Sequence, residues 1–233
     1  MLNKASSQMS IQSEILSATH GGLGHSKRRL WALRILHGIL RRVVQRTRLM
    51  ILRAPRNDFG PPYPEECVLV RVVPTAHSSD QQLAVEAMRA AGEPDGLVAP
   101  RLAHGDEFFG WLIGGRVVSF GWVTRQDRTV GPIRLTKASG RAFLYNFFTL
   151  EGYRGQRLYP ALLLAIRHGL GLERVSDFVI DVDAHNIPSI RGIEKGGFAL
   201  VAQLAFLTLF ARWRCFGSRT LFDRNASSLF RPI

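Results

Sequence analysis

The sequence predicts an α/β domain with a mixed β-sheet, preceded by a helical extension. Two observations carry this prediction. Between residues 67 and 210, apolar strand-like runs alternate with helical segments, in the order strand, helix, three strands, helix, strand, helix, strand. Residues 27–53 instead hold nine cations and no acidic residue. A chain of 233 residues with 46% apolar content can bury one full core and still carry such an extension.

The N-terminal extension is expected to contain a tail and one helix. Residues 1–26 are polar, and we expect them to be disordered, with His20 and His25 as solvated loop residues rather than metal ligands. Residues 28–53 are expected to form a basic amphipathic helix, because apolar and arginine positions recur on separate faces. The apolar face would hold Leu36, Leu40, Val43 and Met50, and the basic face Arg34, Arg41 and Arg48.

Two interpretations of this basic helix remain open. With Trp31 near its start, the helix suits the surface of an anionic membrane. The alternative is a helix that packs on the folded domain and leaves its arginines in water. A specific nucleic-acid partner is not expected, because the segment is too apolar for a phosphate-binding arm and no nucleic-acid motif accompanies it.

A proline-rich linker is expected to separate the extension from the folded domain. Residues 53–64 hold four prolines and one glycine, which disfavour regular structure. We therefore expect three parts: a tail over 1–26, the helix and linker over 27–64, and the domain over 65–233. The domain would begin with a strand at 67–73 and a helix from Ser79 or Asp80 to about Ala91, followed by a loop.

The middle of the domain is expected to supply a hairpin and then the central strand. Two apolar runs flank Gly114-Gly115, which is typical of a tight hairpin turn. Residues 125–140 are polar and are interpreted as a long loop on the substrate side. The expected elements of the hairpin and the rest of the domain are strands at 108–113, 116–124, 142–150, 178–183 and 199–210, and helices at 158–170 and 188–195.

The loop between the central strand and its helix has the properties of a phosphate site. It reads Tyr153-Arg-Gly-Gln-Arg-Leu-Tyr159, and Pro160 fits the first helical turn, where a missing N–H costs nothing. Basic side chains and backbone N–H groups ahead of a helix N-terminus can hold a phosphate or a pyrophosphate.

Two motifs resemble those of the GCN5-related N-acetyltransferases. The loop is similar to that family's coenzyme A pyrophosphate loop, Arg/Gln-x-x-Gly-x-Gly/Ala. Asn186-Ile-Pro-Ser189, followed by Glu194-Lys-Gly-Gly-Phe198, resembles the family's Asn-x-x-Ser/Ala segment and Lys-x-Gly-Phe. The resemblance is clear over about residues 142–200 and does not reach the first 60 residues. It implies a mixed, mostly antiparallel central sheet flanked by helices, with acetyl-CoA as co-substrate and no metal.

The resemblance also implies which residues bind acyl-CoA. Backbone N–H groups from Gly155 to Tyr159 would hold the pyrophosphate, and Asn186 would fix the pantetheine arm or the loop beside it. The exposed backbone after the central strand would pair with pantetheine as an added strand does. The complete set is Phe148, Thr149, Leu150, Arg154, Gly155, Gln156, Arg157, Leu158, Tyr159, Asn186 and Ser189.

The sequence departs from the family pattern at four positions. Arg157 and Tyr159 stand where two glycines usually sit, and ordinary backbone angles would make this tolerable. Ile193 replaces the family's frequent tyrosine acid, and Phe143 occupies the position of a frequent glutamate base.

Other residues must therefore supply any proton transfer to or from the acceptor amine. Glu107, Glu151 and His104 are the candidate bases, and Tyr145 is the candidate acid for the departing thiolate. For Tyr145, a core aromatic with a satisfied hydroxyl is the alternative.

These observations predict an acyl-CoA-dependent N-acyltransferase that transfers an acyl group, expected to be acetyl, to a primary amine by direct attack. The acceptor would be a small-molecule or lipid-linked amine, such as an amino sugar. A non-catalytic acyl-CoA-binding module is the alternative. Cys67 and Cys215 show no metal or disulfide spacing, and no signal peptide or spanning segment is apparent. We expect a cytoplasmic protein, with peripheral contact to the inner face of the membrane as an option.

Overall fold

A computed structural model describes residues 44–57, 64, 66–209 and 213–232. The chain divides into two units, and the first, Met1–Gln45 with Leu207–Trp213, lies mostly outside the described residues. The second unit, Arg46–Phe206 with Arg214–Ile233, contains the helices and the small sheet, and all or most of each strand of the main sheet. The expectations of a tail over 1–26 and of a helix over 28–43 fall outside the described residues.

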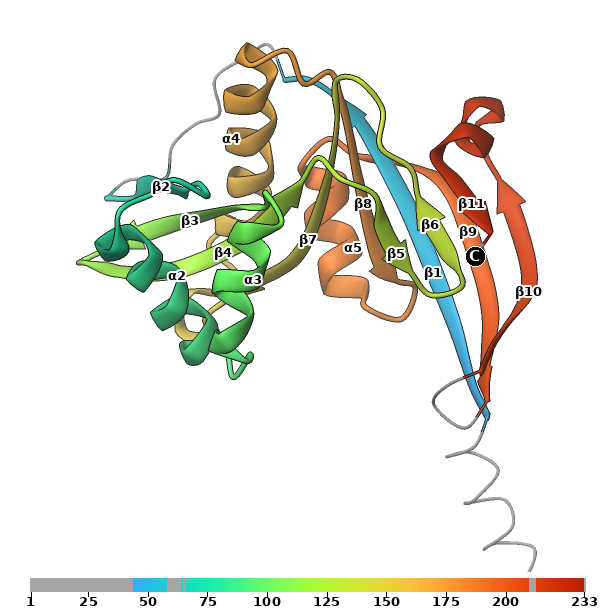
Figure 1. The fold of residues 1–233 in the computed structure, drawn as a ribbon, viewed down its shortest axis with the longest axis horizontal. Coiled ribbons are helices and arrows are strands. Elements are labelled where there is room, and N and C mark those ends of the chain that lie inside the picture. Colours follow the sequence, from blue (N-terminus) through green and yellow to red (C-terminus); the bar gives the residue numbers. More distant parts are fainter. Residues whose placement is uncertain (1–43, 58–63, 65, 210–212, 233) are drawn as a thin grey trace, which may run out of the picture. The chain divides into compact units, whose positions relative to one another are not determined.

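The main sheet has eight strands in the order β10-β9-β1-β8-β7-β4-β3-β2 (Figure 1). The pairs β1–β8, β7–β4, β4–β3 and β3–β2 are antiparallel, and β7–β8 is parallel, so the expected mixed and mostly antiparallel sheet is confirmed. The strands are β1 (Val44–Pro55), β2 (Val68–Val72), β3 (Glu107–Ile113), β4 (Arg116–Thr124), β7 (Arg141–Thr149), β8 (Asp177–Asp183), β9 (Ala199–Leu209) and β10 (Trp213–Leu221).

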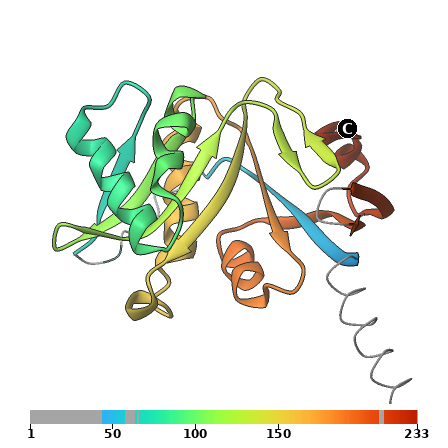
Figure 2. The same ribbon diagram turned by 60° about the horizontal axis from the view of Figure 1, so that its bottom comes forward.

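Helices cover both faces of this sheet. On one face, α4 (Leu158–Leu172) and α5 (Ile187–Lys195) pack on a core that includes Leu52 and Leu144. On the opposite face, α2 (Ser78–Ala90) and α3 (Val98–Ala103) cover a second core built around Phe108 and Trp122 (Figure 2). The apolar face of each helix thus finds a partner on the sheet, as the alternation of strands and helices predicts. A 3₁₀ turn (Asp95–Leu97) and α3 occupy part of the expected loop after α2.

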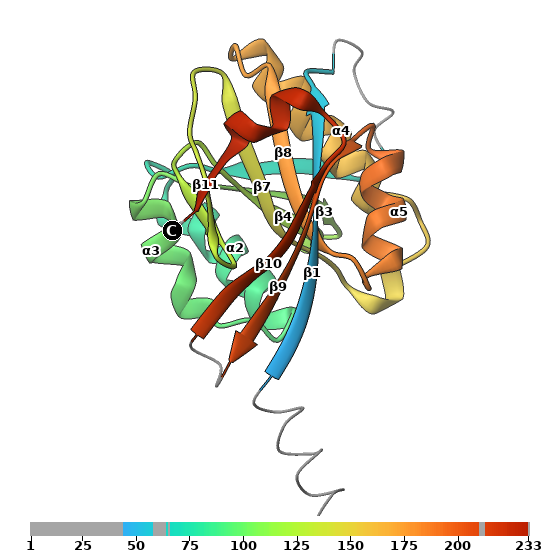
Figure 3. The same cartoon turned by 90° about the vertical axis from the view of Figure 1, so that its right-hand side faces the viewer.

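A small second sheet corrects the expectation of a long loop over residues 125–140. β5 (Arg128–Val130) and β6 (Ile133–Leu135) form a tight hairpin, and β11 (Phe230–Pro232) near the C-terminus pairs with β6 (Figure 3). Val130, Ile133 and Leu135 are buried in a third core that shares Phe143 and Val179 of the main sheet. In β6 the buried Ile133 and Leu135 flank the exposed Arg134, as expected of a strand that covers a core. This alternation is too short to stand out, because most of the other residues over 125–140 are polar.

The expectation of a helix over residues 44–53 is wrong, because these residues form most of β1. This strand lies between β9 and β8 in the sheet, in antiparallel register with β8 from Leu49 to Pro55. Leu49 and Ile51 enter one core, whereas Leu52 and Ala54 enter the core on the other face. A strand buried on both faces is apolar without interruption, and such a run can also be fitted to a helical period. The expected linker therefore begins inside the sheet, and the folded domain starts well before residue 65.

Two features of β7 create the site. β7 and β8 pair only from Arg141–Leu144 to Asp177–Ile180, and beyond these residues the strands separate (Figure 1). Opposite β4, the register shifts so that Asn146 and Phe147 both face Gly121, and Asn146 takes a φ of 51°. A Cβ on Gly121 would lie 2.2 Å from the Phe147 ring, so a larger residue at this position would displace that ring.

Candidate functional site: a basic cleft where two parallel strands separate

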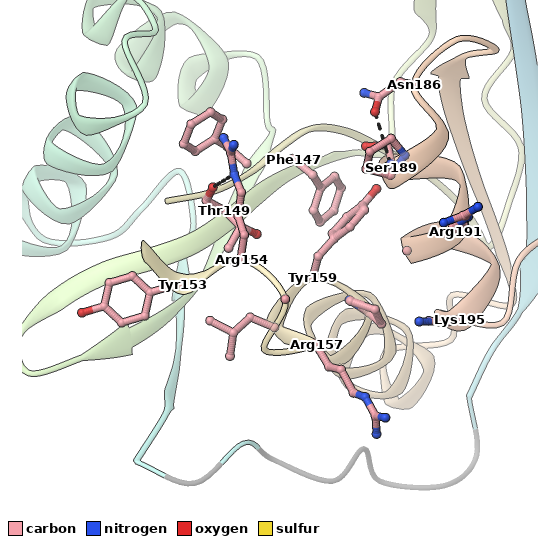
Figure 4. A pocket seen from close by; sticks show the side chains of 16 residues that line it. Phe147, Thr149, Tyr153, Arg154, Arg157, Tyr159, Asn186, Ser189, Arg191 and Lys195 are labelled. Carbon is pink, nitrogen blue, oxygen red and sulfur yellow. Dashed lines mark hydrogen bonds between the residues drawn. The ribbon is translucent and has the colours of Figure 1, made fainter. Parts of the chain in front are cut away.

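A cleft of about 690 Å³ lies where β7 leaves β8 and is bordered by the loop before α4 and by α5 (Figure 4). Of the residues predicted to bind acyl-CoA, the cleft brings together nine: Phe148, Thr149, Arg154, Gly155, Arg157, Leu158, Tyr159, Asn186 and Ser189. Two others lie outside it. Leu150 is buried in the core, where its N–H donates to the Val118 carbonyl, and the exposed Gln156 side chain donates to the Gly152 carbonyl at 3.4 Å.

The loop before α4 presents free donors to this cleft. Gly155 and Arg157 both have a positive φ, of 80° and 60°. Arg157 is the N-cap residue of α4, and its side chain makes no capping hydrogen bond. The N–H groups in the first turn of a helix have no intrahelical acceptor, so an anion can bind them. Ordinary backbone angles were the condition for tolerating Arg157 in place of a glycine, and this condition is not met, because Arg157 adopts the left-handed conformation that a glycine would adopt without strain.

Arg154 is positioned by the end of β7. Its Nε donates to the Thr149 carbonyl oxygen at 3.1 Å, and its guanidinium lies 5.6 Å from the centre of the Phe148 ring (Figure 4). The predicted pairing of pantetheine with the backbone of Thr149 would compete with this hydrogen bond, so the Arg154 side chain must share or leave that carbonyl when a ligand pairs there.

Asn186 and Ser189 begin α5. The Asn186 side-chain oxygen accepts a hydrogen bond from the Ser189 N–H at 3.2 Å, which makes Asn186 the N-cap of the helix. Of the two roles that the resemblance implies for Asn186, this contact supports fixing the local chain.

Tyr159 divides the cleft from a second, smaller cavity of about 220 Å³. Both cavities are lined by Phe147, Tyr159, Asn186 and Ser189. The Tyr159 ring lies 5.3 Å from the Phe147 ring and so close to Gly192 that a Cβ there would be 2.5 Å from it. Burial is the main cause that raises the pKa of Tyr159 well above its usual value, and the Asp181 carboxylate adds to it. Its hydroxyl therefore stays protonated at neutral pH.

Tyr145 lines the second, smaller cavity, but its hydroxyl points to Asp106. The hydroxyl donates to Asp106 Oδ2 at 2.5 Å, and Asp106 Oδ1 lies 2.9 Å from His104 Nδ1. Burial, followed by the hydrogen bond to Asp106, raises the pKa of Tyr145 well above its usual range. The buried Asp106 joins His104 to Tyr145, and no local sequence pattern indicates this link.

The two candidate glutamates line neither cavity. Glu107 is buried at the start of β3, where Arg71 Nε donates to it at 2.7 Å and Arg125 lies at 3.2 Å. Glu151 is exposed in the 3₁₀ turn that follows β7. Both carboxylate oxygens of Glu107 are thus engaged by arginine side chains, and neither carboxylate of the two glutamates faces the cleft.

Several cleft residues were missed by sequence reasoning. They are Phe147, Tyr153, Pro160, Pro188, Arg191, Gly192 and Lys195. Arg191 and Lys195 are four residues apart, so their common face on a short helix was readable from spacing. Phe147 reaches the cleft only because of the bulge in β7, which has no clear sequence signal. Among the described residues, no group of side chains is suited to hold a metal ion, and no helix is long and apolar enough to cross a bilayer.

Comparison with known proteins gives a consistent answer for the fold. No family model matches the sequence, and no curated protein is significantly similar to it in sequence. A solved structure from the GNAT family of Novosphingobium aromaticivorans superposes with a TM-score of 0.50 at 20% identity, over 76% of this chain and 67% of the other. A GCN5-related N-acetyltransferase from Sphaerobacter thermophilus gives 0.51 at 14% identity, over 76% and 54%.

A protein of unknown function from Staphylococcus epidermidis also superposes, with a TM-score of 0.51 at 10% identity, over 75% of this chain and 66% of the other. This chain thus spans about half to two thirds of the length of these structures. The shared arrangement includes the mixed sheet and its flanking helices. The chain has the fold of the GCN5-related N-acetyltransferases.

Proposed function

We propose that the protein is an acyl-CoA-dependent N-acyltransferase that transfers acetyl from acetyl-CoA to a primary amine. The observation that carries this proposal is the cleft itself. Three features border this one basic cleft. They are β7, which separates from its parallel neighbour β8, the loop with positive φ angles, and the start of α4, which has no side-chain cap. Such a cleft suits a pyrophosphate at the loop and an extended pantetheine along β7.

The reaction would be a direct transfer. The amine lone pair attacks the thioester carbonyl carbon and the C–S bond breaks. The nitrogen releases one proton to water as it becomes the amide, and the sulfur leaves as a thiolate that takes up a proton. The cleft contributes by holding the thioester in line with the amine and by placing hydrogen-bond donors near the developing charge. The acceptor is a small-molecule or lipid-linked amine.

Tyr145 is the proposed proton donor to the thiolate. Tyr145 is protonated at neutral pH, but burial and the contact with Asp106 raise its pKa and make it a weaker acid. Its hydroxyl must therefore turn from Asp106 toward the sulfur to act. If it does, Tyr145→Phe lowers kcat much more than it changes the affinity for acetyl-CoA. An unchanged kcat in this variant would leave Tyr145 with a structural role only.

Binding is tested first by thermal unfolding with and without coenzyme A. A ligand that binds only the folded state raises the unfolding temperature, and Arg154→Glu should remove most of that shift. Arg116→Glu is the matched control, because Arg116 is exposed at the hairpin and does not line the cleft. An equal shift in the wild type and in Arg154→Glu would place the phosphate site elsewhere.

A non-catalytic acyl-CoA-binding module is the second candidate. The observation that favours it is that Phe143 and Ile193, at positions where the family often carries a base and an acid, are 0% and 1% exposed and belong to the core. Release of free thiol from acetyl-CoA in the presence of a library of amines distinguishes the two candidates. Coenzyme A binding without thiol release for any amine would support the binding module.

A further inference from the structure

The basic side chains of the cleft come from two separate elements. Arg154 and Arg157 belong to the loop before α4, whereas Arg191 and Lys195 belong to α5 (Figure 4). No carboxylate is among the described residues that line this cleft. The loop pair is already assigned to the pyrophosphate, so the proposed function leaves the α5 pair without a role.

The α5 pair is held toward the cleft by the core. Ile190 and Ile193 bury the opposite side of the helix, at 8% and 1% exposure. Gly192 lies directly against the Tyr159 ring, which fixes the distance between α5 and the start of α4. Because residues four apart share a face of a helix, Arg191 and Lys195 lie one turn from each other.

Neither cation is neutralised within the protein. Both side chains are exposed, and no ion pair joins Arg191 or Lys195 to a carboxylate among the residues that the structure describes. Two unpaired cations on one face of a cleft repel each other unless an anion binds between them. A phosphate monoester, with its nearly two negative charges and three acceptor oxygens, matches such a pair.

Coenzyme A carries such a group in addition to its pyrophosphate, on the 3′ position of its ribose. We propose that Arg191 and Lys195 bind this 3′-phosphate. The inference rests on the proposed binding of acyl-CoA in this cleft. It narrows the acyl donor to coenzyme A thioesters and disfavours thioesters of dephospho-coenzyme A and of protein-bound phosphopantetheine, which lack that phosphate.

The test measures the preference of the full-length protein for coenzyme A over dephospho-coenzyme A by calorimetric titration. Charge-assisted hydrogen bonds predict a wild-type preference of about tenfold to a hundredfold. The double variant R191Q/K195Q should lose most of this preference by weakening coenzyme A binding, with the affinity for dephospho-coenzyme A changed by less than about twofold. The double variant R116Q/R134Q removes the same charge at exposed positions outside the cleft and should keep the preference.

A second probe separates this subsite from the pantetheine region. Adenosine 3′,5′-bisphosphate should bind the wild type more tightly than adenosine 5′-monophosphate, and R191Q/K195Q should remove the difference. Equal weakening of both coenzyme A forms in R191Q/K195Q, or a wild type without preference, would overturn the 3′-phosphate assignment while leaving the proposed function intact. If neither coenzyme A nor dephospho-coenzyme A bound the wild type, the proposed function and this subsite would be overturned together.

Discussion

At the scale of single residues, Arg157 carries a backbone conformation that is costly for its type. Its φ is 60°, and Arg174, at the turn after α4, also has a positive φ, of 68°. The left-handed region costs a residue with a Cβ about 1–2 kcal/mol relative to glycine, which adopts it freely. The strain at Arg157 lies in the cleft, whereas the strain at Arg174 does not.

Arg157→Gly and Arg174→Gly therefore form a matched pair. Each should raise the free energy of unfolding, by up to about 1 kcal/mol, because the gain exceeds the extra entropy of glycine in the unfolded chain. Only Arg157→Gly should weaken coenzyme A binding, since only Arg157 supplies a cation to the cleft. Urea unfolding and ligand titration of both variants check this prediction. Loss of stability in both variants would show that neither arginine is strained.

The residues of the cleft differ in how far the sequence could predict them. Gly155, Arg157 and Asn186 belong to local motifs, whose roles depend on backbone N–H groups and a helix cap within a few residues. Tyr159 was predicted only as a backbone donor, and its ring contact with Phe147 follows from a bulge whose cause, Gly121, is on another strand. The link from Tyr145 to Asp106 spans 39 residues, and no local pattern encodes such a contact.

At the scale of elements, β1 shows why a central strand is hard to recognise. Met50 to Leu52 is a continuous apolar run because the sheet is covered on both faces here, and continuous runs carry no period of two. The strands β3, β4, β7 and β8 were recognisable because turns, a glycine pair or a helix in the sequence mark their ends. The partners of β1 lie more than a hundred residues away, so its membership of the sheet depends on contacts that the sequence does not display.

The position of β1 makes Ile51 essential to the fold. Its side chain is 0% exposed and contacts the core beneath the small sheet. Ile51→Ala should lower the free energy of unfolding by about 2–5 kcal/mol, through lost transfer energy and the cavity left behind. Arg48→Ala, on the same strand but exposed, should have little effect. A loss below about 0.5 kcal/mol for Ile51→Ala in urea unfolding would contradict the placement of β1 in the core.

An ion network joins the end of α4 to strands β2 and β3. Arg71 forms an ion pair with Glu173, and Arg125 Nη2 donates to Glu173 at 2.8 Å. The hydrogen bond from Arg71 is the main cause that lowers the pKa of Glu173 to about 2, from its ordinary 4.5. Because the folded-state pKa is depressed, this stabilisation is present above about pH 4.5 and is lost as the pH falls toward 2.

Glu173→Gln should therefore destabilise the protein at pH 7 and approach the wild type in acid. Because the Glu173 side chain is 40% exposed, solvent screening limits the expected loss at pH 7 to about 1 kcal/mol. The difference in unfolding free energy should shrink steadily from pH 5 to pH 3. A difference that stays constant over this range would show that the pair contributes through packing and not through charge.

At the scale of the whole molecule, most of the net charge comes from one segment of the sequence, whereas most of the sheet and its flanking helices come from the rest. The net charge is +13, and the nine cations of residues 27–53 account for most of it, leaving +4 for the rest. The predicted membrane contact of this basic segment stays a prediction, because residues 27–43 lie outside the described part of the chain. The mixed sheet and its flanking helices were predictable in outline, since each element's apolar face demands a partner, whereas the place of β1 in the strand order was not.

The same charge should steer anionic ligands to the protein. A positive molecule attracts coenzyme A from a distance of about one Debye length, which falls from about 30 Å at 0.01 M salt to about 3 Å at 1 M. We therefore expect the association rate of coenzyme A, measured by stopped-flow mixing, to fall by about tenfold or more over this range, with a smaller change in the dissociation rate. Pantetheine, which is uncharged, is the control and should associate at a rate that salt leaves unchanged. If both ligands lost association rate equally, salt would be acting on the protein's conformation, and long-range attraction by its net charge would be ruled out as the cause.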